Sequence, residues 1–143
     1  MNDDLPIGAH LVTMRTWYEH HGIYAGNGRV VHYSGFCHGY HAGPVEEVSL
    51  ADFERGQGFR IRLHGHALFA GEQIVARARS RIGEHGYRLL ANNCEHFCEW
   101  CTTGRSRSRQ VERLLVFPRL LVRRVFREIA AFVAGTAAAR QTA

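Results

Sequence analysis

Two short β-rich segments, residues 20–24 and 29–33, flank the glycines at positions 26 and 28. Runs of this kind on either side of a glycine turn predict a β-hairpin. Because a short turn joins only antiparallel strands, the chain is expected to build its core on an antiparallel sheet.

The remaining elements follow a simple order. They are predicted strands at 11–14 and 59–64, a short capped helix at 49–54, a loop at 36–44 and a helix at 70–82 that Gly83 ends. A further helix is expected after Asn92 or Asn93, because an asparagine side chain caps a helix start. Strands precede helices without regular alternation, which favours an α+β fold.

The 143 residues of the chain fit one domain. Charge is distributed unevenly along it. The net charge of +5 arises after residue 104, where nine arginines face two acids, and the rest of the chain is slightly acidic. The part of the chain up to residue 104, called the body below, has no basic stripe, which argues against nucleic-acid binding. The acidic start at residues 1–4 lacks the basic and apolar parts of a secretion signal, so a cytoplasmic location with reduced cysteines is expected.

Cys94 lies in the run Asn92-Asn93-Cys94-Glu95-His96-Phe97, in the first turn of a predicted helix. A helix N-terminus stabilises a thiolate, and its backbone N–H groups are free to bind an oxyanion. Most buried cysteines are inert packing residues, so position alone does not establish reactivity. The context nevertheless makes Cys94 a candidate nucleophile in need of a general base.

Among ten histidines, His20 and His32 stand out because they flank the predicted hairpin. A turn centred on Gly26 places the two histidines directly across from each other on one sheet face. A two-residue Asn27-Gly28 turn instead pairs residue 23 with His32 and separates the histidines, unless a bulge intervenes. Both registers stay open, as does the interpretation of both residues as ordinary sheet histidines.

These motifs resemble the lecithin:retinol acyltransferase family, which includes the phospholipase A/acyltransferases. The resemblance rests on the runs His20-His21-Gly22-Ile23-Tyr24-Ala25-Gly26, Arg29-Val30-Val31-His32 and Asn93-Cys94-Glu95-His96-Phe97, and it covers roughly residues 5 to 115. It implies a circularly permuted papain-like, NlpC-type fold with an antiparallel sheet packed on helices. His10 departs from the family, where an acidic residue is common.

The chemistry implied by this resemblance is acyl transfer or acyl hydrolysis through a thioester, with no cofactor or metal. Cys94 becomes the nucleophile, His20 the general base and His32 the residue that orients His20. His21 takes a position that is aromatic in the family. The acyl donor is a phospholipid or another lipid ester. The alternatives are a cysteine peptidase or amidase, and a domain that binds a partner without turnover.

A basic amphipathic helix is expected over residues 114–143, after a catalytic domain at 5–113. Pro118 fits its start, and arginines occupy one half of the helical wheel. The longest uncharged stretch, 129–139, has 11 residues, whereas about twenty are needed to span a bilayer. Such a helix lies on an anionic membrane, or packs on the body or a second copy. The sequence does not predict the oligomeric state.

Cys94, Cys98 and Cys101 have the spacing of a radical-enzyme iron–sulfur motif. The same spacing places three packing residues on one helix face, and those enzymes need a far larger barrel, so we reject the cluster. A zinc site that uses His96 with these thiols is an alternative.

The other histidine pairs receive simpler interpretations. His64 and His66 lie two apart on a predicted strand, as a ligand pair does, but without further partners they are interpreted as solvated strand residues. His38 and His41 belong to the predicted loop, where they either border the site or are merely exposed.

Overall fold

The computed structural model describes residues 5–35, 42–88 and 93–141, with side chains as far as Ile129. The chain divides into two compact units, Met1–Ser108 and Arg109–Ala143. The first unit holds the sheet, and the second consists of one helix. The positions of Cys37, His38, His41 and Asn92 lie outside the described residues.

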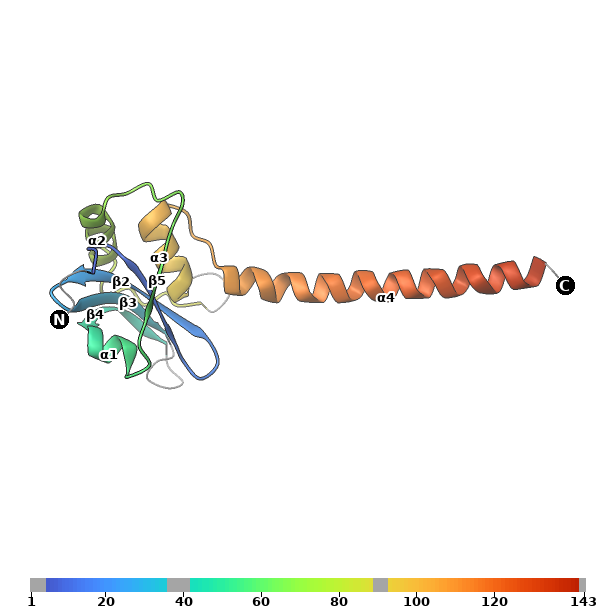
Figure 1. The fold of residues 1–143 in the computed structure, drawn as a ribbon, viewed down its shortest axis with the longest axis horizontal. Helices are drawn as coiled ribbons and strands as arrows, with labels where there is room; N and C mark the ends of the chain where they lie inside the picture. Colours follow the sequence, from blue (N-terminus) through green and yellow to red (C-terminus); the bar gives the residue numbers. More distant parts are fainter. Residues whose placement is uncertain (1–4, 36–41, 89–92, 142–143) are drawn as a thin grey trace. The chain divides into compact units, whose positions relative to one another are not determined.

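A five-stranded antiparallel sheet organises the first unit (Figure 1). Its spatial order is β4-β3-β2-β1-β5. The strands are β1 (His10–Met14), β2 (Glu19–Gly26), β3 (Arg29–Gly35), β4 (Gly43–Ser49) and β5 (Arg60–Arg62). With the helices described below, this sheet confirms the predicted α+β class.

The β2–β3 hairpin combines a two-residue turn with a bulge. Asn27 and Gly28 have φ values of 50° and 65°, the left-handed pair that a type I′ turn requires. A register shift between Tyr24 and Gly26 then places Gly22 opposite His32. Neither unbulged register was right, whereas the bulge considered above is present. The bulge keeps His20 and His32 on one face. His20 lies two residues before Gly22, the partner of His32, and side chains two residues apart on a strand share a face.

Three helices cover the two faces of the sheet. α1 (Leu50–Glu54) lies on one side, and α2 (Gly71–Arg79) and α3 (Cys94–Thr103) lie on the other (Figure 1). The core is correspondingly split into two clusters. Leu11, Tyr24 and Val30 pack with Leu50 and Phe53 of α1. Beneath α2 and α3, the cluster contains Ile23, Val31, Tyr33, Val45, Ile74, Val75, Ala78, Cys94, Phe97, Cys98 and Cys101.

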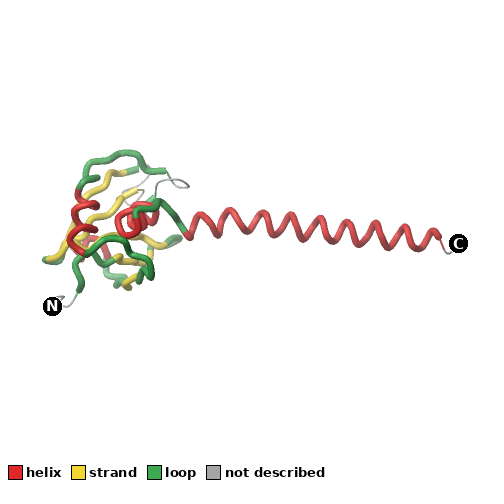
Figure 2. The backbone as a smooth tube through the Cα atoms, turned by 90° about the horizontal axis from the view of Figure 1, so that it is seen from above, coloured by secondary structure: helices red, strands yellow, loops and turns green. Residues whose placement is uncertain are grey.

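Helix starts follow the predicted capping chemistry. The hydroxyl of Ser49 accepts a bond from the Asp52 N–H at 3.0 Å, and Arg55 closes α1 in the left-handed conformation. Asn93, one of the two predicted caps, begins α3. α2 ends at Arg79, earlier than the expected Gly83, and a series of turns follows it through residue 83. Figure 2 shows the helices in red and the turns and loops that join the elements in green.

Two strand predictions needed correction. β4 was not predicted, and it begins at Gly43, inside the segment interpreted as a loop. Its side chains do not alternate in hydrophobicity, since Glu46 and Glu47 are adjacent; ladder hydrogen bonds to β3 hold it instead. β5 is shorter than the predicted strand and ends at Arg62, so His64 and His66 lie in the loop that follows.

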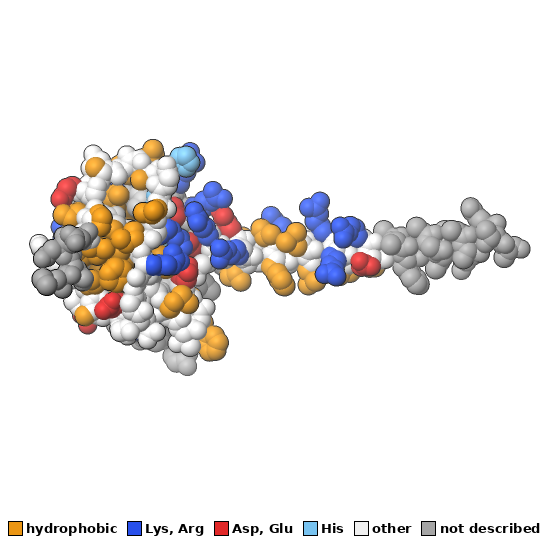
Figure 3. All heavy atoms as spheres, viewed as in Figure 1, with side chains coloured by type: hydrophobic (Ala, Val, Ile, Leu, Met, Phe, Trp, Pro, Cys, Tyr) orange, Lys and Arg blue, Asp and Glu red, His pale blue; other side chains and the backbone are white. Residues whose placement is uncertain are grey.

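The second unit is the single helix α4, Arg109–Gln141. Pro118 lies inside it and is not its first residue. The strong helix formers before Pro118 extend the helix by two turns, and the proline removes one backbone hydrogen bond. Apolar side chains from Leu114 to Ile129 are about half exposed or more, with arginines among them (Figure 3). Within the described part of the chain, no helix is both long and apolar enough to cross a membrane.

Candidate active site

Cys94 is the first residue of α3, where Asn93 organises the helix start. The side-chain oxygen of Asn93 accepts bonds from the N–H groups of Glu95 and His96, each at 3.0 Å. The Asn93 N–H in turn donates to Nδ1 of His96 at 3.4 Å. This reciprocal cap fixes Cys94 at the positive end of the helix dipole, which favours the thiolate.

The cap also changes the expectation for oxyanion binding. Two first-turn N–H groups beside Cys94, those of Glu95 and His96, are engaged by Asn93. They are therefore not free donors, contrary to the expectation from a bare helix N-terminus. His96 itself serves as a capping residue.

The three helix thiols share the face that packs on the sheet, as the spacing predicts. Cys94, Cys98 and Cys101 are free cysteines with exposures of 3%, 0% and 0%. Burial raises the pKa of Cys98 well above its usual value and that of Cys101 to about 12. Cys98 and Cys101 are therefore neutral packing residues at physiological pH.

His20 and His32 are brought together on neighbouring strands. Nε2 of His20 lies 2.8 Å from Nδ1 of His32, so one nitrogen donates and the other accepts. Both rings pack near Phe53 of α1, with centroid separations of 5.4 and 5.9 Å. On the far side of His32, its Nε2 lies 3.4 Å from Oε1 of Glu46. The three side chains form a row across β2, β3 and β4.

The environment of His20 keeps its imidazole neutral. Burial, with smaller contributions from His32 and Arg15, lowers the pKa of His20 well below its usual value. A neutral imidazole held by a second ring has a fixed tautomer and orientation. Those are the properties that a general base needs before it accepts a proton.

His21 takes the opposite side of β2. Its Nδ1 lies 2.9 Å from Nε2 of His10. Burial and the charge of Arg62 lower the pKa of His21 to about 3, while Glu95 of α3 acts in the other direction. Because successive side chains of a strand point to opposite faces of the sheet, His20 and His21 are separated. His20 lies beside Phe53, and His21 lies on the side covered by α3.

Glu95 is a buried carboxylate directly after the candidate nucleophile. It accepts a bond from Nη1 of Arg62 at 2.6 Å and another from the hydroxyl of Ser108. Its exposure is 0%. A charge in that position is tolerated because its oxygens are paired and hydrogen-bonded. The contact ties the first turn of α3 to β5.

The described contacts thus unite two of the three predicted site residues. His20 contacts His32, and Cys94 packs in the cluster beneath α3. The interpretation of His64 as a solvated strand residue was wrong, because its ring is mostly enclosed and its Nε2 lies 2.7 Å from Nδ1 of His10. His66 is exposed.

Glu46 is a candidate site residue that sequence reasoning missed. It pairs directly with His32 across the β3–β4 ladder, but the strand that carries it has no alternating pattern. A signal was nevertheless present in the extended run of residues 45–48, two valines around two glutamates, directly before the Ser49 cap.

Several known proteins are similar to this chain in sequence. The family model described as "Lecithin retinol acyltransferase" matches residues 3–107. Human "Phospholipase A and acyltransferase 4" is 30% identical over 118 residues, which cover 71% of this chain and 72% of that protein. Rat "Lecithin retinol acyltransferase" is 25% identical over 146 residues, with coverages of 81% and 62%. The human protein of the same name is 26% identical over 157 residues, with coverages of 91% and 68%. The chain spans less than two thirds of the rat relative.

Proposed function

Because the chain belongs to the lecithin retinol acyltransferase family, we propose that it is a thiol acyltransferase or acyl hydrolase acting on a lipid ester. The observation that carries the proposal is the Asn93-capped start of α3, which holds Cys94 within the family's motif. Relatives named as acyltransferases support the same reaction class. We also propose the circularly permuted papain-like fold, in which histidine-bearing strands precede the cysteine helix.

In the proposed reaction, His20 takes the thiol proton of Cys94 while Sγ attacks the ester carbonyl carbon. The tetrahedral intermediate collapses, the ester C–O bond breaks, and the leaving alcohol receives the proton from His20. A thioester remains on Cys94. An alcohol, an amine or water then attacks the thioester with His20 as base, and the thiol is restored.

Supporting roles fall to His32 and Glu46. The 2.8 Å contact between the two imidazoles orients His20. Glu46 lies near the other nitrogen of His32 and stabilises the positive charge that the pair gains when His20 accepts a proton. The assignment of His20 to Cys94 rests on the family motif alone. The described contacts of the histidine, with Tyr18, Phe53 and His32, lie on the side of the sheet that α1 covers, whereas Cys94 packs with Ile23 and Val31 on the other side.

A lipid turnover assay tests this function. The purified chain is incubated with phosphatidylcholine in mixed micelles, and lysophospholipid and fatty acid are measured by mass spectrometry. We expect release by the wild type and by Cys98→Ala, whose thiol is one turn away and fully buried, but not by Cys94→Ala. Turnover of a peptide amide without lipid turnover would indicate a peptidase. No turnover of either substrate would favour a partner-binding domain.

We further propose that α4 makes peripheral contact with an anionic membrane. Its exposed apolar residues include Phe117, Leu121 and Phe126. Arginines at 119, 123, 124 and 127 accompany them. Apolar side chains that enter the headgroup boundary, with cations that attract acidic lipids, would hold the enzyme close to its substrate.

A further inference from the structure

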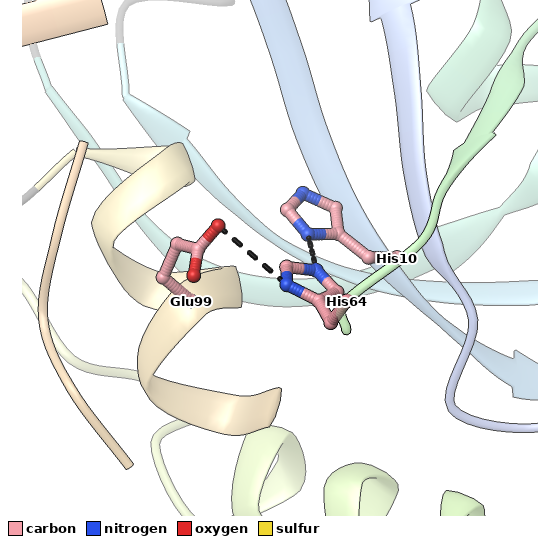
Figure 4. Close-up of side chains that lie close together, drawn as sticks. All are labelled: His10, His64 and Glu99. Atoms are coloured by element: carbon pink, nitrogen blue, oxygen red, sulfur yellow. Dashed lines mark hydrogen bonds and ion pairs between the residues drawn. The ribbon is translucent and has the colours of Figure 1, made fainter. Parts of the chain in front are cut away.

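Three side chains from separate segments converge beside β1. His10 comes from β1, His64 from the loop after β5, and Glu99 from α3 (Figure 4). Nδ1 of His10 lies 2.7 Å from Nε2 of His64, and Nδ1 of His64 lies 3.7 Å from Oε1 of Glu99. One candidate ligand atom from each residue lies within 4.8 Å of the others.

We propose that His10, His64 and Glu99 bind a zinc ion. Two imidazoles and one carboxylate are the ligand set of many catalytic zinc sites, which leave the fourth position to water or another ligand. Imidazole nitrogens also favour zinc over magnesium or calcium, which prefer oxygen ligands.

Burial prepares these side chains to bind a cation. His10 is 1% exposed, and the side chains of His64 and Glu99 are 10% and 12% exposed. A carboxylate enclosed beside two imidazoles supplies the negative charge.

The surroundings provide the supporting contact that a metal-binding histidine needs. Nε2 of His10 lies 2.9 Å from Nδ1 of His21. When Nδ1 of His10 binds the ion, its Nε2 carries the proton and donates to His21, which fixes the tautomer. Arg62 opposes the cation, with Nη1 4.0 Å from Oε1 of Glu99. That nitrogen is already paired with Glu95 at 2.6 Å, which partly offsets its charge.

A cavity gives access to the ion and to its fourth position. It has a volume of about 210 Å³ and is lined by both histidines, with Ile61, Leu63 and Thr102 among its walls. This volume accommodates several water molecules or a small ligand. The geometry therefore points to zinc held by three protein ligands, with the remaining position open to the cavity.

The competing explanation is a metal-free chain of hydrogen bonds through the same rings. The distances of 2.9 and 2.7 Å suit such bonds along His21, His10 and His64. The 3.7 Å separation of His64 from Glu99 is too long for one. A chain of this kind predicts no specific metal uptake, which makes the two explanations separable.

Zinc titration of the full-length chain tests the site without reference to activity. The protein is stripped with a chelator and titrated with zinc against a chromogenic competitor, and the melting temperature is recorded in parallel. We expect one zinc per chain and a higher melting temperature with zinc. His64→Ala and Glu99→Gln should each weaken binding by at least about 10-fold. His66→Ala is the matched control, an exposed histidine in the same loop, and should bind like the wild type.

Cobalt substitution identifies the donor atoms. A visible spectrum of a four-coordinate site without a thiolate charge-transfer band supports imidazole and carboxylate ligands. A thiolate band that disappears in Cys94→Ala would place the metal at the cysteines and overturn the proposal. So would the absence of stoichiometric zinc, or unchanged affinity in folded His64→Ala or Glu99→Gln. Should His64→Ala fail to fold, Glu99→Gln alone decides.

Discussion

At the scale of single residues, two adjacent histidines have different environments. His20 contacts His32 and Phe53, whereas His21 contacts His10 on the side of α3. Both are buried and both have lowered pKa values. Only their partners distinguish them, so their roles must be separated by substitution.

We predict that His20→Ala lowers lipid turnover by about 10²–10⁴-fold, the usual contribution of a general base. His21→Ala should lower it by less than about 10-fold, because His21 acts only through packing and its bond to His10. Both variants are compared with the wild type at pH 7.5, and circular dichroism checks that each is folded. Equal losses in the two variants, or a larger loss for His21→Ala, would contradict the assignment of His20.

The sequence predicts individual site residues better than their contacts. Cys94 and its Asn93 cap follow from local chemistry, because capping involves residues three apart or fewer. The contact between His20 and His32 depends on a bulge before the Asn27-Gly28 turn, and turn residues alone do not specify a bulge. The contact between His10 and His64 joins residues 54 apart, and no local pattern predicts it.

At the scale of elements, predictions succeeded where local signals dominate. α1 begins after its serine cap as expected. β4 escaped prediction because its pairing with β3, and not its own pattern, holds it in place. The start of α4 was misplaced because proline is compatible with a first turn but is also tolerated inside a long helix, at the cost of a hydrogen bond.

α4 yields a prediction for membrane contact. The full chain should sediment with vesicles that contain phosphatidylserine and much less with pure phosphatidylcholine vesicles, because arginines near an anionic surface each contribute about 1 kcal/mol. A chain lacking residues 114–143 should remain in the supernatant. Equal sedimentation of the two chains would contradict membrane contact through α4. Equal sedimentation of the full chain with both kinds of vesicle would contradict a role for its arginines.

At the scale of the whole molecule, buried neutral histidines couple folding to pH. Burial lowers the pKa of His10 and His20 well below 6.5 and that of His21 to about 3. The unfolded chain therefore binds protons near pH 6.5 that the folded chain does not bind until much lower pH. The stabilisation is complete above pH 6.5 and is lost progressively as the pH falls.

We predict that the free energy of unfolding falls between pH 6.5 and pH 5, by up to about 1.4 kcal/mol per pH unit for each such histidine. Urea unfolding at pH 7.5, 6.5 and 5.5 in the presence of a chelator measures it without bound metal. His66→Ala, which removes an exposed ring, should keep the same slope. A free energy that is constant or rises as the pH falls would contradict the neutral, buried state of these rings.

The most direct measurement of the central claim is the intact mass of the protein after brief exposure to an activated acyl ester. We predict that the wild type and Cys98→Ala gain the mass of one acyl group, that hydroxylamine removes it as expected for a thioester, and that Cys94→Ala gains none. Acylation of Cys94→Ala to the same extent as the wild type would contradict the assignment of Cys94 as the nucleophile.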